Sequence, residues 1–474
     1  MKKTLKSKKI YILAITVLAV MLAVFFAGCT PKQVEVNKVD VDGTLGDRAF
    51  EYMQTLAGEE LAGRTLGTQG ELDGATYIAG IMKELGYNSA YSSGEIEGVQ
   101  EFKTSIKRFD GAEIKDTTAH NVIFTKKSKA DESKGEIILC CQYDNLYLEN
   151  SSVSGTTWNS DGSYESGSGI AVLLTLAEEL KDKPCDYDLT FAFFTGGCYG
   201  WKGAMNYVDN LDRSSLNNVA LALNFTLLGG GDNWYIYSGE SETTYGKYLY
   251  ACSGGNSTAV PKDRNIGQFI LSEDSRYNYA NIGMLSNQYF FDCKDIPTAN
   301  FISLNWEIND NPLFSEMEGK ENIYHTKNDT LQSMIERKGE EEIKAQLFQV
   351  ISATLTALDM SNENALTSSL EVAKGEMPDR LPQSGKSSML ADLIVKILLI
   401  AILIGISYVI KNRLYRNIDK YINAKKARES AGEEGEKEQE PFEFDVTRVD
   451  VEERAEAPRQ EKNHENKHDD DPFV

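Results

Sequence analysis

The amino-acid sequence predicts an α/β fold, in which a twisted, mainly parallel sheet is sandwiched by helices, together with a transmembrane helix near each terminus. Two observations support this fold class. Apolar runs of strand length alternate with longer segments whose apolar residues recur at helical spacing, which is the pattern of βα units around a parallel sheet. Two further apolar runs, 10–27 and 389–410, are long enough to cross a bilayer.

The central predicted element is the segment LTFAFFTGGCYGWKG, residues 189–203. Leu189 to Phe194 form an apolar strand of β-prone residues, and Gly196 and Gly197 then permit a tight turn. Ligands bind at the carboxyl ends of strands in open α/β sheets, so this turn is expected at the edge of a site. The other predicted strands are 121–125, 136–142 and 220–225, and the predicted helices are 48–56, 75–85, 169–180 and 340–358.

Residues 1–30 are interpreted as an export leader. Lysines precede the apolar run, and Gly28 and Cys29 follow it. Two interpretations remain open: a signal anchor that stays in the membrane, or a cleaved leader whose Cys29 is acylated as in bacterial lipoproteins. The segment Ala27–Cys29 resembles a lipobox, although Phe26 stands where leucine is usual. Both interpretations export the residues that follow.

The remainder of the chain divides into a domain, two linkers, a membrane span and a tail. Residues 31–44 and 361–388 are interpreted as linkers on either side of the domain 45–360. Lys and Arg residues cluster directly after the span 389–410, and such clusters favour the cytoplasmic side. We therefore expect a protein of a bacterial cell membrane with an extracytoplasmic domain and a cytoplasmic tail, 411–474.

Charge and cysteine content narrow the possible partners. The chain of 474 residues carries a formal net charge of −23, which argues against a nucleic-acid partner. Residues 431–474 are strongly acidic and are expected to be disordered. They are interpreted as a solubilising tail, or as a docking segment around Phe442–Phe444 or Pro472–Phe473. The seven cysteines show no framework spacing, so no disulfide is assigned.

Six short segments, taken together and in this order, are informative about the family. They are Leu61-Ala62-Gly63-Arg64, Gln142-Tyr143-Asp144, Glu165-Ser166-Gly167-Ser168-Gly169, the strand and loop from Phe193 to Tyr207, Leu223-Asn224-Phe225-Thr226 and Tyr324-His325-Thr326. Together they resemble metallopeptidase family twenty-eight, the co-catalytic zinc aminopeptidases, over roughly residues 50–358. This resemblance implies a zinc-exopeptidase-like fold, with a two-metal site at the carboxyl ends of the strands.

Several positions depart from the pattern that the resemblance implies. Gln142 stands in place of the first histidine ligand, and Thr226 in place of an aspartate ligand. Gly197 stands where family members have the glutamate general base, which takes a proton from the attacking water. Asp144 matches a carboxylate that orients the lost histidine. Hydrolysis by the usual mechanism of the family is therefore not expected, and the enzyme assignment stays open.

Three positions could still hold one metal ion. By resemblance, Glu165 replaces the bridging aspartate, Cys198 replaces a glutamate ligand, and His325 is unchanged. Three protein ligands are the usual pattern of an open zinc site, and the related glutaminyl cyclases hold one zinc at the matching places. In the alternative interpretation, Cys198 is a small semi-buried residue and His325 a hydrogen-bonded loop residue. Asp161 and Glu165 are weak candidates for a replacement base.

Two functions from different classes follow. The first is a membrane-anchored pseudoenzyme with no cofactor, which binds a peptide or a protein through the former cleft as a subunit of a membrane assembly. The second is a metal-dependent peptidase or cyclase with one zinc ion on Glu165, Cys198 and His325. A surface lipoprotein whose tail has no partner is a third possibility.

Overall fold

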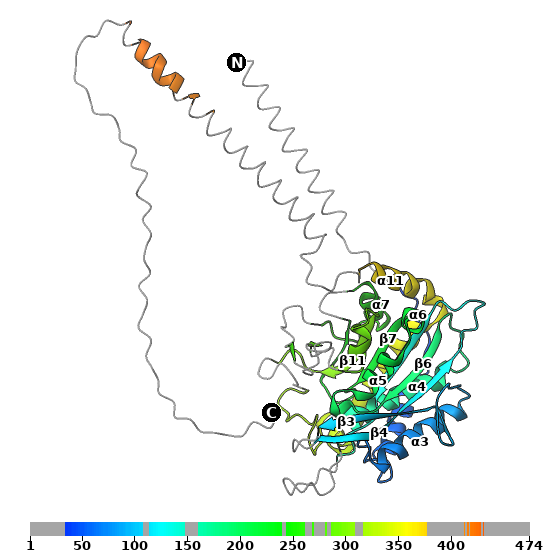
Figure 1. Cartoon of the computed structure of the whole chain (residues 1–474). Helices are drawn as coiled ribbons and strands as arrows, with labels where there is room; N and C mark the ends of the chain where they lie inside the picture. Colours follow the sequence, from blue (N-terminus) through cyan, green and yellow to red (C-terminus); the bar gives the residue numbers. More distant parts are fainter. Residues whose placement is uncertain are drawn as a thin grey trace, which may run out of the picture. The chain divides into compact units, whose positions relative to one another are not determined.

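The computed structural model describes residues 34–107, 113–146, 160–238, 243–260, 268–269, 280–281, 286–308 and 316–376 and, further along the chain, 412, 415–416, 418–427 and 430. The chain divides into two compact units, Met1–Pro382 and Gln383–Val474. The first unit holds the sheet and the labelled helices in Figure 1.

A seven-stranded sheet forms the centre of the first unit, with the strand order β3-β4-β6-β5-β7-β11-β8 (Figure 1). Strands β6, β5, β7 and β11 are mutually parallel. Strand β4 is antiparallel to both of its neighbours, and β8 is antiparallel to β11. The predicted α/β fold with a mainly parallel sheet is confirmed. The strands are β3 Val99–Lys107, β4 Glu113–Lys126, β5 Glu136–Gln142, β6 Asp188–Phe194, β7 Val219–Thr226, β8 Asn233–Tyr237 and β11 Thr298–Leu304.

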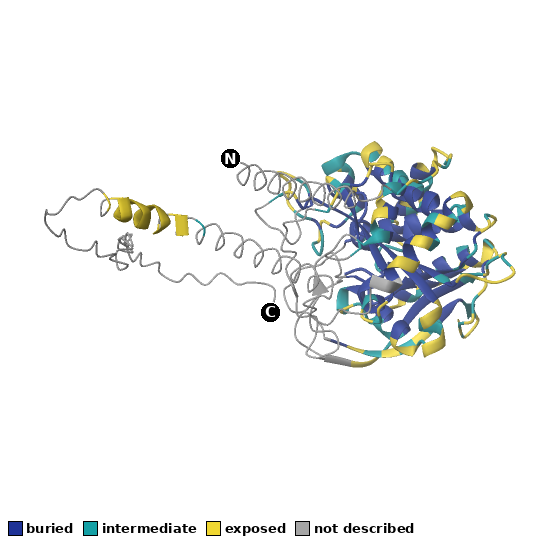
Figure 2. Ribbon diagram, turned by 90° about the horizontal axis from the view of Figure 1, so that it is seen from above, coloured by how far each residue is buried: buried dark blue, intermediate teal, exposed yellow. Residues whose placement is uncertain are grey.

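Helices cover both faces of the sheet, as the alternation of side chains along β6 shows. Successive strand residues point to opposite faces. Phe191 packs edge-on against Tyr87, with ring centroids 4.9 Å apart, and the Tyr87 hydroxyl donates to the carbonyl of Ala177 in α4. Phe194 instead packs against Tyr207 of α5 and Phe291 of α8. The central strands are therefore buried on both faces (Figure 2), which explains why they are apolar throughout.

The described helices are α2 Leu45–Leu56, α3 Gln69–Glu84, α4 Ser168–Leu180, α5 Lys202–Asn210, α6 Arg213–Asn218, α7 Thr244–Cys252, α8 Gln288–Asp292, α9 Leu331–Lys338, α10 Glu340–Leu358 and α11 Glu363–Glu376. Short turns of other helix types are η1 Ser163–Gly167, η2 Gly197–Tyr199 and η4 Met360–Asn362, and two-residue strands are β1 Ser92–Ser93, β2 Ile96–Glu97, β9 Gln268–Phe269 and β10 Ala280–Asn281. Local sequence determines where helix α3 begins and ends: the Thr68 hydroxyl caps its first turn, and Gly86 follows its end with φ +85°.

The fold departs from the sequence prediction at the edge strands β3 and β8, and also at β11, a fully buried strand inside the sheet that was not predicted. Strand β4 begins at Glu113, eight residues before the predicted strand at 121, and pairs with the unpredicted edge strand β3. Exposed polar residues alternate along β3, so it lacks the continuous apolar run that marks the central strands. Helix α11 lies inside the predicted linker 361–388, and its Leu366, Leu370 and Ala373 join the core. The domain thus continues past residue 360, to at least residue 376.

The first described segment of the domain is joined by hydrogen bonds to the turn that precedes helix α11. The backbone N–H of Asn37 donates to Oδ1 of Asn362 at 2.7 Å, and the Asn362 amide donates back to the carbonyl of Asn37 at 2.9 Å. The Asn37 amide also donates to the carbonyl of Ser361. The described part of the predicted linker 31–44 is therefore attached to the domain, because Val34, Val36 and Val41 also pack against the core.

The described part of the second unit is helical over residues 418–427. No helix among the described residues of the chain is long and apolar enough to cross a membrane. The predicted spans 10–27 and 389–410, the lipidation candidate Cys29 and the acidic tail 431–474 all lie outside the described residues. Five described cysteines, Cys140, Cys141, Cys185, Cys198 and Cys252, are free thiols.

Candidate functional site

The predicted site residues gather at the carboxyl ends of the parallel strands. Gln142 is the last residue of β5 and Thr226 the last of β7, while Gly197 and Cys198 lie in the short helix η2 that follows β6. Glu165 lies in η1, a π-type turn directly before α4. His325 lies on the connection between β11 and α9. This is the edge where ligands bind in open α/β sheets, and π-type turns are frequent at functional sites.

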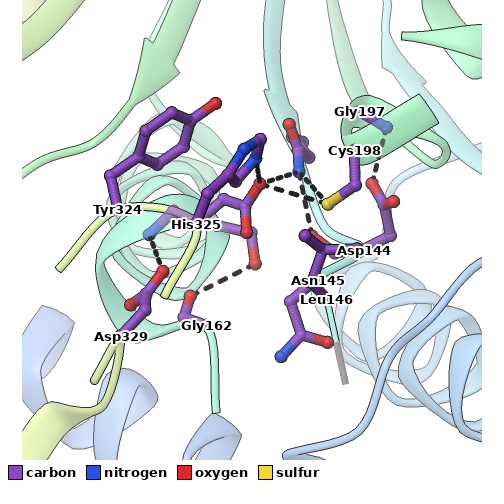
Figure 3. A network of polar contacts seen from close by, with 12 residues as sticks. Asp144, Asn145, Leu146, Gly162, Gly197, Cys198, Tyr324, His325 and Asp329 are labelled. Carbon is purple, nitrogen blue, oxygen red and sulfur yellow. Dashed lines mark hydrogen bonds and ion pairs between the residues drawn. The ribbon is translucent and has the colours of Figure 1, made fainter. Parts of the chain in front are cut away.

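One carboxylate oxygen organises the site. Oε1 of the buried Glu165 lies 2.7 Å from Nε2 of His325 and 3.1 Å from Sγ of Cys198, and it accepts from Nε2 of Gln142 at 3.3 Å. In Figure 3, the dashed lines from His325 and Cys198 meet at one carboxylate oxygen. The donor atoms of Glu165, Cys198 and His325 all lie within 4.8 Å of one another. Among the described residues, this is the one group of three potential metal ligands, and it is the predicted one.

The protonation states of this cluster follow from its surroundings. Burial alone would raise the pKa of Glu165, but the charge of His325 and hydrogen bonds from His325, Cys198 and Gln142 outweigh it and hold that pKa below its ordinary value. Burial and the neighbouring carboxylates of Glu165 and Asp144 raise the pKa of Cys198 well above its usual range. Glu165 is therefore ionised, Nε2 of His325 donates to it, and Cys198 is a neutral thiol rather than a nucleophilic thiolate.

Gln142 occupies the space that a side chain at Gly197 would need. A Cβ atom built on Gly197 would lie 1.8 Å from Oε1 and 1.9 Å from Cδ of Gln142. The Gln142 amide is held there by donation to the carbonyl of Asp144 at 3.1 Å, in addition to Glu165 and Cys198. The side chain at position 142 therefore fills the space that any side chain at position 197 would need.

Asp144 supports the loop that carries Cys198. The carboxylate is fully buried and accepts from the backbone N–H of Gly197 at 2.8 Å through Oδ1 (Figure 3). Its Oδ2 has no hydrogen-bond partner within the described part of the chain. Burial raises the pKa of Asp144 from 3.8 to about 8, against the effect of the Gly197 N–H. The resemblance predicted a carboxylate that orients a histidine, and here it orients backbone instead.

Replacement Asp144→Asn is expected to stabilise the fold increasingly as pH rises from 5 to 8. The raised pKa means that the folded state holds a proton which the unfolded chain releases near pH 4, so the carboxylate costs stability above that pH, up to about pH 8. The gain should reach a few kcal/mol at pH 8, on the order of 1.4 kcal/mol per unit of pKa shift removed. Chemical denaturation at both pH values measures it. Asp212→Asn, at an exposed helix cap, should change stability equally at both; an Asp144→Asn effect equally flat would contradict the assignment.

Two carboxylates that the sequence analysis missed hold the site loops in place. Asp329 accepts from the backbone N–H groups of Tyr164 and Glu165 at 2.8 and 3.1 Å. Glu316 accepts from the N–H groups of Ile323 and Tyr324, and it pairs with Arg337 at 2.7 Å. These bonds fix the chain on either side of His325, which has a φ of +54°. A usable sequence signal was Asp329 followed by Thr330, a helix-capping residue.

Two other predicted residues lie outside the cluster. Asp161, the weak candidate for a base, accepts from the backbone N–H groups of Ser163 and Leu331 at 2.9 and 3.1 Å, so it stabilises the starts of η1 and α9. Thr226 is buried at the end of β7, paired in register with Ile302 of β11. Neither residue belongs to the group of potential ligands.

Arg64, in the motif Leu61–Arg64, forms hydrogen bonds with the segments that carry the site residues. It is completely buried, and its five N–H groups have five acceptors: the carbonyls of Tyr143, Leu56, Leu61 and Asp161 and the hydroxyl of Ser166. Asp144 directly follows the acceptor Tyr143, and Glu165 directly precedes the acceptor Ser166. Arg64 therefore connects the first motif of the sequence to both loops of the site.

Comparison with known proteins shows a similarity over part of the chain. Residues 121–351, just under half of the chain, match the family model described as Peptidase family M28. The matched region runs from strand β4 into helix α10 and contains the whole cluster around Glu165. The predicted resemblance is supported over this region.

Individual relatives extend the comparison. The chain is 26% identical over 251 residues to the "Alkaline phosphatase isozyme conversion protein" of Escherichia coli, covering 52% of this chain and 69% of that protein. It is 31% identical over 112 residues to "BOS complex subunit ncln" of Danio rerio, covering 21% of this chain and 18% of that protein. A solved structure of a zinc aminopeptidase from Bacillus subtilis aligns over 68% of this chain and 97% of that one, with 16% identity and a TM-score of 0.48.

Proposed function

We propose that the M28-like domain of this chain binds a peptide or protein ligand outside the cytoplasm and does not hydrolyse it. The observation that supports this proposal is the packing of Gln142 against Gly197. A hydrolytic base there would need a side chain at residue 197, and Gln142 lies where its first atom would be. Loss of a general base costs roughly 10²–10⁴ in rate.

The two candidates for a replacement base, Asp161 and Glu165, already hold other groups. Both oxygens of Asp161 accept from backbone N–H groups, and Oε1 of Glu165 lies within hydrogen-bond distance of Gln142, Cys198 and His325. A base must reach the proton that it removes without giving up such contacts. Neither residue is therefore a replacement for the missing glutamate, which favours binding over turnover.

The proposed setting is a membrane assembly of a bacterial cell. The sequence predicts an apolar segment at each end of the chain and a domain between them on the outer side. The relative named "BOS complex subunit ncln" is a subunit of a complex by its name, which supports a subunit role for an M28-like chain. A neighbouring membrane protein, or a peptide that it presents, is the proposed ligand.

A single-zinc enzyme is the second candidate, favoured by the cluster of Glu165, Cys198 and His325. A carboxylate, a thiol and an imidazole within 4.8 Å suit zinc chemically. These three residues would hold the ion, and a bound zinc ion would polarise a carbonyl oxygen as a Lewis acid. Cys198 would lose its thiol proton to become a ligand, and His325 would lose the Nε2 proton that it donates to Glu165.

One set of assays on the full-length protein distinguishes the binding function from the single-zinc enzyme. We expect no release of product from aminoacyl chromogenic substrates, with or without added zinc. If the cluster holds zinc, about one ion per chain will be found by plasma mass spectrometry, and the affinity will rise roughly tenfold per pH unit as the thiol proton is displaced.

Two variants test whether any measured zinc binding or turnover depends on the cluster. His325→Ala should remove any bound zinc, whereas His464→Ala, in the tail, should not. Turnover that depends on His325 but not on His464 would overturn the binding proposal and establish the single-metal enzyme. A protein without zinc and without turnover would leave the binding function as proposed.

A further inference from the structure

The helix at 418–427 in the second unit exposes large apolar side chains. It is the orange helix in Figure 1, and Figure 2 shows it as exposed along its length. Ile418, Tyr421 and Ile422 are 45%, 74% and 44% exposed, and Tyr415 just before them is 56% exposed. The other exposed large apolar side chains among the described residues are Tyr250, Met360 and Val372.

The apolar side chains share one face. Residues 415, 418 and 422 follow the i, i+3, i+7 spacing of a helical stripe, and residue 421 lies beside them. At 100° per residue the four span an arc of roughly 120°. Arg416, Lys420 and Asn423 lie on the opposite side of the same helix, so this helix is amphipathic.

The charged residues of the helix are mostly basic. Arg416 and Lys420 lie on the side opposite the apolar stripe, and Lys425 and Lys426 lie within or beside it, against one described acidic residue, Asp419. The sequence immediately before the helix adds Lys411 and Arg413, directly after the apolar run 389–410. An apolar stripe with Lys and Arg on the other side is the signature of a helix that lies in a membrane interface, and basic clusters next to a span attract anionic lipid.

We propose that the helix 418–427 lies along the surface of an anionic membrane. Ile418, Tyr421 and Ile422 enter the boundary between head groups and acyl chains, and the basic side chains contact lipid phosphates. Lys425 falls within the apolar arc, where its long stem can lie along lipid while the ammonium group reaches the phosphates. Pairing with a second copy fits less well, because a coiled coil requires apolar positions sustained over three or four heptads.

Photocrosslinking on the full-length protein tests this placement. Tyr421→p-benzoylphenylalanine puts a reactive ketone of similar shape on the apolar stripe, and Asn423→p-benzoylphenylalanine puts it on the opposite side. Both proteins are reconstituted into bilayers of phosphatidylcholine alone or with one third phosphatidylglycerol, irradiated, and analysed by intact mass. We expect lipid adducts at position 421, at least fivefold more than at position 423, and more of them in the anionic bilayer.

Charge variants complete the test. In the position-421 protein, Lys420→Glu with Lys426→Glu should lower lipid adducts severalfold in the anionic bilayer, with little change in phosphatidylcholine alone. Equal adducts at both positions, or none at either, would overturn the proposal. A crosslinked dimer of the chain in place of lipid adducts would also overturn it, and would assign the stripe to self-association.

Discussion

Replacement Arg64→Met will lower the free energy of unfolding by about 4 kcal/mol, the range expected when one side of a buried charged network is removed. The side chain is fully buried and all five of its N–H groups have acceptors. Methionine keeps much of the volume but leaves four backbone carbonyls without these donors, and unsatisfied buried polar groups are costly. Urea unfolding of the full-length protein at neutral pH measures the change.

The matched control is Arg48→Met. Arg48 pairs with Glu178 and Glu179 at 3.1 Å each, but its side chain is 35% exposed, and exposed pairs contribute about 1 kcal/mol or less. If the two replacements cost the same, Arg64 does not have the central role assigned to it. Arg64→Lys should recover little, since a single ammonium group cannot reach acceptors arranged around a planar guanidinium.

Replacement Gly197→Glu, which introduces the glutamate that the resemblance implies at this position, will destabilise the chain by about 3 kcal/mol, because the new Cβ meets the Gln142 amide at 1.8 Å. Adding Gln142→Ala should recover about 2 kcal/mol of this loss, a coupling energy typical of side chains in direct contact. A double-mutant cycle by chemical denaturation measures that coupling.

Gly200→Ala supplies the control for this cycle. It lies in the same turn with φ +85° and has nothing within 4 Å of an added Cβ, so it should cost about 1 kcal/mol through backbone strain alone. That cost should add to the Gln142→Ala cost without coupling. Additive behaviour of Gly197→Glu as well would show that Gln142 moves aside freely, and the main support for a non-hydrolytic site would be lost.

The sequence predicted most of the apolar centre of the fold but missed the buried strand β11. Strand 136–142 and helix 340–358 match β5 and α10 residue for residue, because a strand buried on both faces and a long helix with a buried apolar side both leave clear patterns. The edge strand β3 and helix α11 were missed, since their residues are largely polar and they bury only one side. Tertiary packing, rather than local pattern, determines such elements.

The residues of the candidate site were predicted from the sequence, but several of their contacts depend on tertiary structure and were not. Glu165, Cys198 and His325 came from the spacing of motifs, and the structure brings them within 4.8 Å. The relation between Gln142 and Gly197 depends on the register of two strands, in which Gln142 lies beside Phe194, and no local pattern gives that register. The roles of Asp329 and Glu316 depend on long connections that meet the site only after folding.

The hydrogen bonds between Asn37 and Asn362 have a mechanical consequence. They hold the start of the described domain beside the turn that precedes its last helix, α11. A force applied between the two flanking segments would therefore load these bonds and the packing of α11 first, and the central sheet would be shielded until both had opened.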